Sequence, residues 1–130
     1  MHSHNARIGS VVLLIIAAAT PTSVRGQSVK PDLSGLANDE QAMIEAACNL
    51  DRSVRGPAAY YGCLRRQLQA LRNGPDRPSL TNISNAERDM IERACNLDRS
   101  VRGPAVYYGC LNRQLQALRK GMNSKRRSAS

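Results

Sequence analysis

Hydrophobic side chains recur along this chain with the spacing of helical faces. In one stretch they fall mostly three and four residues apart, at Met43, Ile44, Ala47, Cys48 and Leu50. A second stretch follows with apolar residues at positions i, i+4, i+8 and i+11, namely Tyr60, Leu64, Leu68 and Leu71. Spacing of three and four residues places side chains on one face of an α-helix. The pattern therefore predicts two amphipathic helices in succession.

Capping residues indicate where these two helices begin and end. Asn38 is a good N-cap, and the carboxylates that follow it favour the positive end of the helix dipole. We expect the first helix to end around Arg52, because the chain then leads into a Gly-Pro pair. Pro57 should open the second helix, since proline at a first helical position needs no N–H donor. Gly74 is placed to close it.

The whole pattern occurs twice. Residues 43–74 match residues 90–121 at 28 of 32 positions, with an offset of 47. In the second copy Ser84 or Asn85 would cap the first helix and Pro104 would open the second. The four differences are Ala46/Arg93, Ala59/Val106, Arg65/Asn112 and Asn73/Lys120. The sequence predicts an all-α protein of two tandem helical hairpins.

The repeat also sets the expected boundaries of the units. The first hairpin should occupy residues 33–74 and the second residues 80–121. Residues 75–79 between them contain two prolines, which cannot continue a helix, and they are interpreted as a linker. The basic tail, 122–130, has one apolar side chain beyond alanine and is expected to be disordered.

Residues 1–26 have the pattern of a secretory signal peptide. Arg7 precedes a nine-residue apolar run at 11–19, and a polar segment with a proline follows. Small residues at the −3 and −1 positions favour cleavage before Gln27, with cleavage after Ala19 as the alternative. The apolar run is too short to span the roughly 30 Å of a bilayer core. The mature protein is therefore expected to be exported, into the periplasm or the medium.

Removal of the signal changes the chemistry that remains. Both histidines, His2 and His4, lie inside it, so the mature chain contains no imidazole. This excludes catalytic sites of the Ser-His-Asp and Cys-His types and histidine zinc sites. Loss of Arg7 and Arg25 lowers the net charge from +9 to +7. An exported basic protein meets anionic envelope polymers, membrane surfaces or other exported proteins more readily than it meets nucleic acid.

The four cysteines are divided equally between the two units. Two lie in each copy, one on each predicted helix, with fourteen residues between them: Cys48 and Cys63, then Cys95 and Cys110. An even number of cysteines at matching spacing in an exported chain favours disulfides. Four cysteines allow three pairings, of which repeat symmetry favours the two within units. A redox pair would need C-x-x-C, and a zinc site normally uses short cysteine knuckles. We expect neither a metal nor another cofactor.

Basic residues concentrate in the repeats and supply the candidate binding residues. In the first copy they are Arg52, Arg55, Arg65, Arg66 and Arg72, and in the second Arg99, Arg102, Arg113, Arg119 and Lys120. They are interpreted as contacts for an anionic surface or partner. The alternative is a solvated face with a few i,i+4 pairs, for example Asp51 with Arg55.

The remaining side chains give little support to catalysis. Carboxylates are few, and no nucleophile motif, phosphate loop or metal triad is present. The only aromatics are two Tyr-Tyr pairs, in which one member of each faces the leucines and is expected in the core. The other member would cover the disulfide or serve as an exposed contact. The chain is not expected to be an enzyme.

The spacing Ala47-Cys48, fourteen residues, Cys63-Leu64, enclosing Gly56-Pro57-Ala58 and Tyr60, resembles short cysteine-paired helical repeats of predicted exported bacterial proteins. In those proteins the unit often accompanies other modules. The resemblance covers 64 of the 130 residues, carries no catalytic residue to transfer, and implies a bacterial envelope location.

Two functions remain after these exclusions. The first is a non-enzymatic exported interaction module, whose basic helix faces contact an anionic envelope component or a protein. The second is a cationic membrane-active or toxin-like secreted peptide. A weaker third is an accessory inhibitor or chaperone of an exported enzyme.

Overall fold

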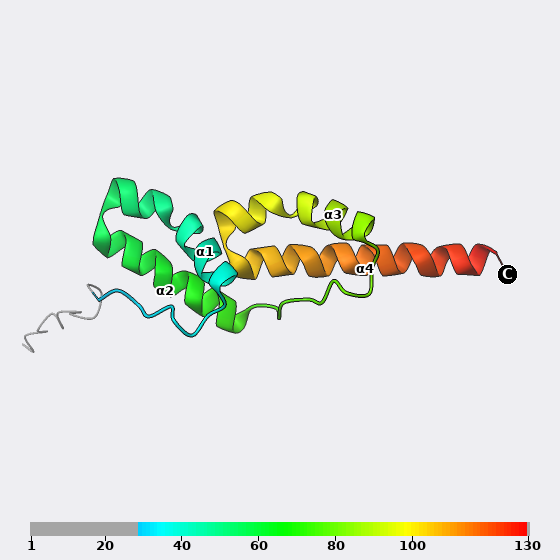
Figure 1. Ribbon diagram of the computed structural model, residues 1–130, viewed down its shortest axis with the longest axis horizontal. Coiled ribbons are helices and arrows are strands. Elements are labelled where there is room, and N and C mark those ends of the chain that lie inside the picture. Colours follow the sequence, from blue (N-terminus) through cyan, green and yellow to red (C-terminus); the bar gives the residue numbers. More distant parts are fainter. Residues whose placement is uncertain (1–28, 130) are drawn as a thin grey trace, which may run out of the picture.

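A computed structural model describes residues 29–129 of the chain (Figure 1). Every regular element in that range is helical and none is a strand, which confirms the all-α prediction. The order is α1 (Asn38–Ala47), a π-helical turn η2 (Asp51–Arg55), α2 (Pro57–Asn73), α3 (Asn85–Ala94), a second π-helical turn η3 (Asp98–Arg102) and α4 (Pro104–Ser128). The predicted signal peptide, residues 1–26, lies outside the described residues. None of the helices in the described range is long and apolar enough to cross a membrane.

Two disulfides tie the helices into pairs. Cys48 bonds Cys63 across α1 and α2, and Cys95 bonds Cys110 across α3 and α4. The Cα–Cα distances are 5.7 and 5.8 Å, and all four side chains are buried. The predicted pairing is therefore confirmed. We refer below to the α1–α2 pair and the α3–α4 pair.

The first helices of the two pairs, α1 and α3, differ in how well their N-termini are capped. At α3, Ser84 is the N-cap: its Oγ accepts the Glu87 N–H at 3.3 Å, and Glu87 Oε2 accepts the Ser84 N–H at 2.9 Å. The Ser84 hydroxyl also donates to Glu87 Oε2 at 2.7 Å, and this bond, followed by the one from the Ser84 N–H, lowers the pKa of Glu87. At α1 the N-cap is Ala37, which has no side-chain oxygen, and only its N–H is bonded, to Glu40 at 3.3 Å. The predicted cap, Asn38, is the first helical residue instead.

The helical winding continues past the point at which the sequence predicts its end. After Cys48 the chain forms the π-helical turn η2, so the winding ends at Arg55 rather than Arg52. The hydroxyl of Ser53 donates to the Asn49 carbonyl at 2.8 Å, a back-bond that bends helices. Gly56 then reverses the chain with φ 83° and ψ −178°, a conformation that is essentially restricted to glycine. η3 repeats this arrangement.

The segments that lead into α1 and α3 follow equivalent paths. Arg65 Nη1 donates to the Val29 carbonyl at 3.2 Å. The equivalent bond in the second repeat, with donor and acceptor each 47 residues later in the chain, runs from Asn112 Nδ2 to the Asp76 carbonyl at 3.3 Å. Each segment places two apolar residues against the core of its own pair, namely Leu33 and Leu36 in the first and Leu80 and Ile83 in the second. The predicted linker, 75–79, thus enters a segment that packs on its own helix pair.

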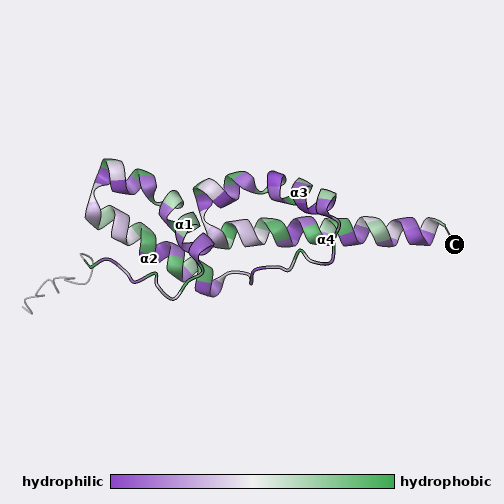
Figure 2. Cartoon of the chain, viewed as in Figure 1, coloured by the Kyte–Doolittle hydropathy of each residue, from purple (hydrophilic) through white to green (hydrophobic). Residues whose placement is uncertain are grey.

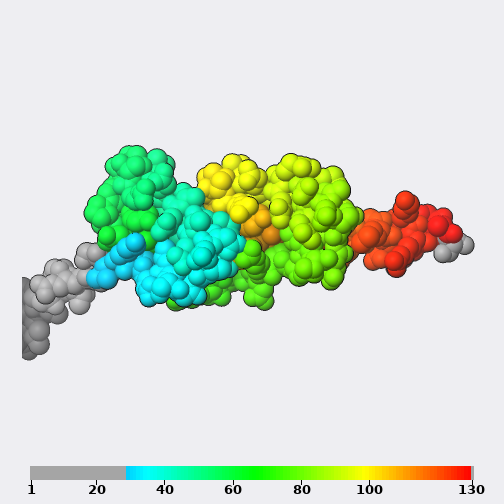
Figure 3. Space-filling model, viewed as in Figure 1, coloured from blue at the N-terminus to red at the C-terminus, as the bar shows by residue number. Residues whose placement is uncertain are grey.

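α4 is longer than its counterpart α2. The sequence predicts a helix end at Gly121 and a disordered tail over 122–130, whereas the helix continues to Ser128 and projects from the body of the molecule (Figure 3). α2 is followed closely by Pro75, which cannot continue a helix, but Gly121 is followed by Met122. Basic side chains in the last turn of α4 also favour the negative end of the helix dipole.

The turn of the α3–α4 pair packs against the end of the α1–α2 pair that lies opposite its own turn. We call this contact the joint, the turn of each pair its tip, and the opposite end its open end. The tip of the α3–α4 pair is η3 and the start of α4. It packs against the open end of the α1–α2 pair, so that α1 contacts η3 and α4 while α2 contacts α4. Met43 of α1 belongs to the hydrophobic cluster of the α3–α4 pair, and Leu71 of α2 packs against both clusters. The molecule is therefore elongated, with hydrophobic and hydrophilic bands along its helices (Figures 1 and 2).

Candidate functional site

The ten candidate basic residues separate into three groups. Three of them line one open pocket, together with Asp51, near the tip of the α1–α2 pair: Arg55, Arg65 and Arg66. Two lie over tyrosine rings, Arg52 at 5.9 Å from the Tyr60 centroid and Arg99 at 5.8 Å from that of Tyr107. The other five are exposed and spread over both pairs: Arg72, Arg102, Arg113, Arg119 and Lys120. Within residues 29–129, the first group is the one that brings three of the candidate residues into a single pocket.

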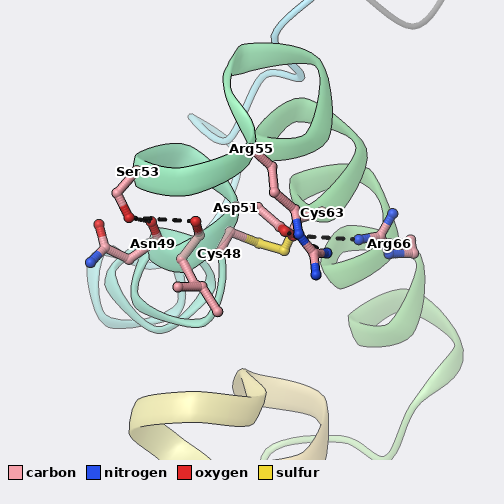
Figure 4. A network of polar contacts seen from close by, with 8 residues as sticks. Cys48, Asn49, Asp51, Ser53, Arg55, Cys63 and Arg66 are labelled. Atoms are coloured by element: carbon pink, nitrogen blue, oxygen red, sulfur yellow. Dashed lines mark hydrogen bonds and ion pairs between the residues drawn. A yellow bond between two sulfur atoms is a disulfide. The ribbon is translucent and has the colours of Figure 1, made fainter.

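We call this concave site the arginine groove. It is an open pocket of about 650 Å³ between η2 and α2. Its charged lining consists of Asp51, Arg55, Arg65 and Arg66, and its remaining lining consists of Ala58, Ala59, Gly62 and Gln69. Figure 4 shows Arg55 and Arg66 converging on Asp51 beside the Cys48–Cys63 disulfide. Residues from two elements therefore meet at one carboxylate.

Asp51 lies between two guanidinium groups. Its Oδ1 is 3.2 Å from Arg55 Nη1, and its Oδ2 is 3.7 Å from Arg66 Nη2. The Asp51 side chain is only 15% exposed, whereas those of Arg55 and Arg66 are 69% and 72% exposed. The carboxylate is thus largely covered, while both guanidinium groups still reach solvent and can bind a further anion.

Local structure explains why these side chains share a face. Asp51 opens η2 three residues after Cys48, which the disulfide holds against α2. Arg55 follows four residues later, at the spacing that brings helical side chains together. On α2, a Cβ at Gly62 would lie 3.4 Å from Arg66 Nη1, so the absence of a side chain there gives the guanidinium room. The disulfide and the small residue together form the groove.

The charges of the groove suit the binding of anions. Three guanidinium groups and one carboxylate line the groove, and two of the three pair with that carboxylate. Arginine presents planar N–H pairs that match carboxylate and phosphate oxygens. Guanidinium stays protonated at physiological pH, so these groups can bind and orient but do not exchange protons. Within residues 29–129, no group of three His, Cys, Asp or Glu side chains could hold a metal ion. The arrangement is suited to recognition.

The equivalent position in the second repeat is less basic. Asp98 and Arg102 repeat the ion pair at 3.3 Å. Asn112 stands where the first repeat has Arg65, and its Nδ2 donates to the Tyr108 carbonyl at 3.0 Å. The substitution removes one guanidinium from this face. The two repeats therefore differ in the charge that they present on this face.

Sequence reasoning anticipated part of this site. It named all three arginines, and the Asp51–Arg55 pair at i,i+4 spacing is confirmed. It did not join Arg66 to Asp51, because that contact depends on how α2 lies against η2. It predicted a buried member in each Tyr-Tyr pair, and Tyr60 and Tyr107 are both buried. It gave no indication that Tyr108 would also be buried.

Comparison with known proteins adds no relative. No family model matches this chain, and no match is found among curated proteins or solved structures. Function is therefore inferred from the residues of the chain itself.

Proposed function

We propose that this protein is a non-enzymatic exported binding module, built as two tandem disulfide-stapled hairpins behind a cleaved signal peptide. Its arginine groove binds an anionic group on an envelope component or on a protein partner. The observation that carries the proposal is that Arg55 and Arg66 both pair with the single carboxylate of Asp51, in a groove that Arg65 also lines. The two disulfides support an oxidising location, where such bonds persist.

The physical basis of the proposal is the geometry of the groove rather than overall charge. Surface ion pairs alone contribute little, because solvent and salt screen them. Charge-assisted hydrogen bonds from several guanidinium groups to one ligand are stronger and more specific. Arg55 and Arg66 are already drawn together by Asp51, so binding an anion orders fewer side chains than it would on an open helix face.

The test is binding of fluorescently labelled polyphosphate, a soluble phosphate polymer, followed by anisotropy at physiological salt. The triple variant R55Q/R65Q/R66Q should bind at least about tenfold more weakly than the unchanged chain, equivalent to ~1.4 kcal/mol. The matched control is R113Q/R119Q/K120Q, which removes the same charge from α4 and should lose far less. Equal losses in the two variants would show that net charge, and not the groove, determines binding.

A second candidate is the membrane-active peptide. Leu50 and Val54 are 66% and 71% exposed near the tip that carries the groove, which would suit contact with a lipid surface. Release of dye from phosphatidylglycerol vesicles distinguishes the two functions. Leakage at low protein concentration favours the membrane-active peptide, whereas polyphosphate binding without leakage favours the binding module.

A further inference from the structure

Identical residues in the two repeats differ in burial, and the differences are concentrated at the joint. Met43 is 4% exposed, whereas its counterpart Met90 is 56% exposed. Tyr108 is 1% exposed, whereas Tyr61 is only half-buried. Pro104 is fully buried, but the matching proline of the first repeat is exposed. In each case the more buried copy lies in the joint and the more exposed copy lies at a free end of the molecule.

The joint is held by specific contacts as well as by apolar packing. The Tyr108 hydroxyl donates to Glu40 Oε1 at 2.8 Å, and Gln67 Nε2 donates to the Arg102 carbonyl at 3.2 Å. A Cβ at Gly103 would collide with the side-chain amide of Gln67, so the two surfaces approach closely. The joint is therefore a close and directional contact.

Both halves of the joint are present a second time and unused. The open end of the α3–α4 pair carries a largely apolar pocket of about 260 Å³ lined by Glu87, Met90, Ile91, Gln114, Ala117 and Leu118. Each of these residues is identical to its counterpart 47 positions earlier, in the end that receives the joint. The matching tip residues are Arg55, Gly56, Pro57 and Tyr61, at the free end of the α1–α2 pair. The residues of the joint are thus present a second time at the two free ends, although α4 continues past Gly121 where α2 ends at Asn73.

We propose that a second copy of this chain docks its α1–α2 tip into the pocket at the open end of the α3–α4 pair, repeating the joint between molecules. Tyr61 of one copy then takes the place of Tyr108 and donates to Glu87 of the next. Such a head-to-tail contact leaves one tip and one end free after each addition, so copies continue to add in a row.

Two differences make the contact between copies weaker than the joint. Within the joint Arg77 Nη2 pairs with Asp39 Oδ2 at 2.7 Å, and Arg77 also lies 5.9 Å from the Tyr108 ring centroid. Lys30 and Ala86 occupy the corresponding positions between copies, so the carboxylate of this ion pair is missing. We therefore expect assembly that depends on protein concentration. This proposal does not depend on the anion-binding function, because the pocket that receives the tip shares no residue with the arginine groove. Of the four tip residues, only Arg55 also lines that groove.

Sedimentation velocity of the oxidised chain over a range of concentrations tests the proposal. The unchanged chain should give species larger than a monomer, in amounts that rise with concentration. P57E places a carboxylate on the tip, at a first helical position where acidic residues are tolerated. M90E places one in the pocket, on an exposed side chain. Each variant alone should remain monomeric, because docking would bury an unpaired charge.

Mixing the two variants separates this arrangement from others. M90E keeps an intact tip and P57E an intact end, so an equimolar mixture should form a 1:1 dimer and nothing larger. The control Q116E adds the same charge to an exposed site on α4 and should assemble like the unchanged chain. Circular dichroism establishes that each variant is folded. A chain that stays monomeric at all concentrations, or a single variant that still dimerises, overturns head-to-tail docking.

Discussion

Tyr108 has a structural role that its counterpart in the first repeat, Tyr61, lacks. Its ring is buried in the joint, and its hydroxyl donates to Glu40. Burial, and then this hydrogen bond, raise the pKa of the phenol well above its usual value of 10.0. Burial also raises the pKa of Tyr107. Tyr108 therefore resists ionisation while the joint is intact, and Tyr107 does so while its ring stays buried.

The raised pKa values predict alkaline sensitivity. A group whose pKa is higher in the folded state contributes stability that is complete below its unfolded pKa and is lost as the pH rises further. The free energy of unfolding should therefore fall above about pH 10, by up to ~1.4 kcal/mol per pH unit for each tyrosine. Urea unfolding between about pH 8 and pH 11 measures this slope.

The variant Y108F assigns part of that slope to one hydroxyl. It should cost about 1 kcal/mol at neutral pH, because a buried hydrogen bond is lost, and it should flatten the alkaline decrease. E40Q keeps an acceptor for the hydroxyl while removing its charge, and should flatten the decrease less. An alkaline slope that is unchanged in Y108F would contradict the assignment.

At the scale of elements, the disulfides replace the core that a pair of short helices lacks. Each closes a loop across a sequence separation of 15, which stabilises by about 3 kcal/mol on the chain-entropy model. The hydrophobic cluster of the α1–α2 pair contains only seven buried residues. Neither helix pair has a large apolar interior that could compensate for the loss of its disulfide.

Replacing one disulfide at a time tests this dependence. The variants C48A/C63A and C95A/C110A should each lower the free energy of unfolding by about 3 kcal/mol, measured by urea titration under oxidising conditions. Reduction with dithiothreitol should destabilise the unchanged chain further than either variant, since it opens both loops. Losses below about 1 kcal/mol would mean that packing alone holds the pairs.

Helix ends were the least predictable elements. The sequence located the prolines that open α2 and α4, and these act locally through a fixed φ. It did not predict the π-helical turns, because Asp51 and Arg55 have no strong preference for one winding over another. It also ended α4 too early, at Gly121, where a glycine costs only about 1 kcal/mol and no proline follows.

At the scale of the molecule, the joint makes the two repeats unequal. Met43 and Met90 occupy the same place in two nearly identical repeats, yet only Met43 lies in a core cluster. It enters the cluster of the other pair, so its stability contribution depends on the joint. The two methionines therefore form a matched comparison.

Truncation of each methionine measures the joint directly. M43A should cost about 2–5 kcal/mol, because it leaves a cavity among buried side chains. M90A should change the free energy of unfolding by less than about 0.5 kcal/mol, since its side chain is exposed. Both are measured by urea unfolding at a concentration low enough to keep the chain monomeric. Equal costs would show that the pairs do not pack together in solution.

The sequence by itself determined what local chemistry controls. Helical spacing, prolines and matched cysteines predicted the helices and both disulfides, because these depend on neighbours along the chain or on repeat symmetry. Only the tertiary structure decided which copy of each methionine, proline and tyrosine is buried. Burial belongs to two surfaces in contact, and two nearly identical sequences cannot indicate which of their ends meet. The joint makes that choice, by packing the tip of one pair onto the end of the other.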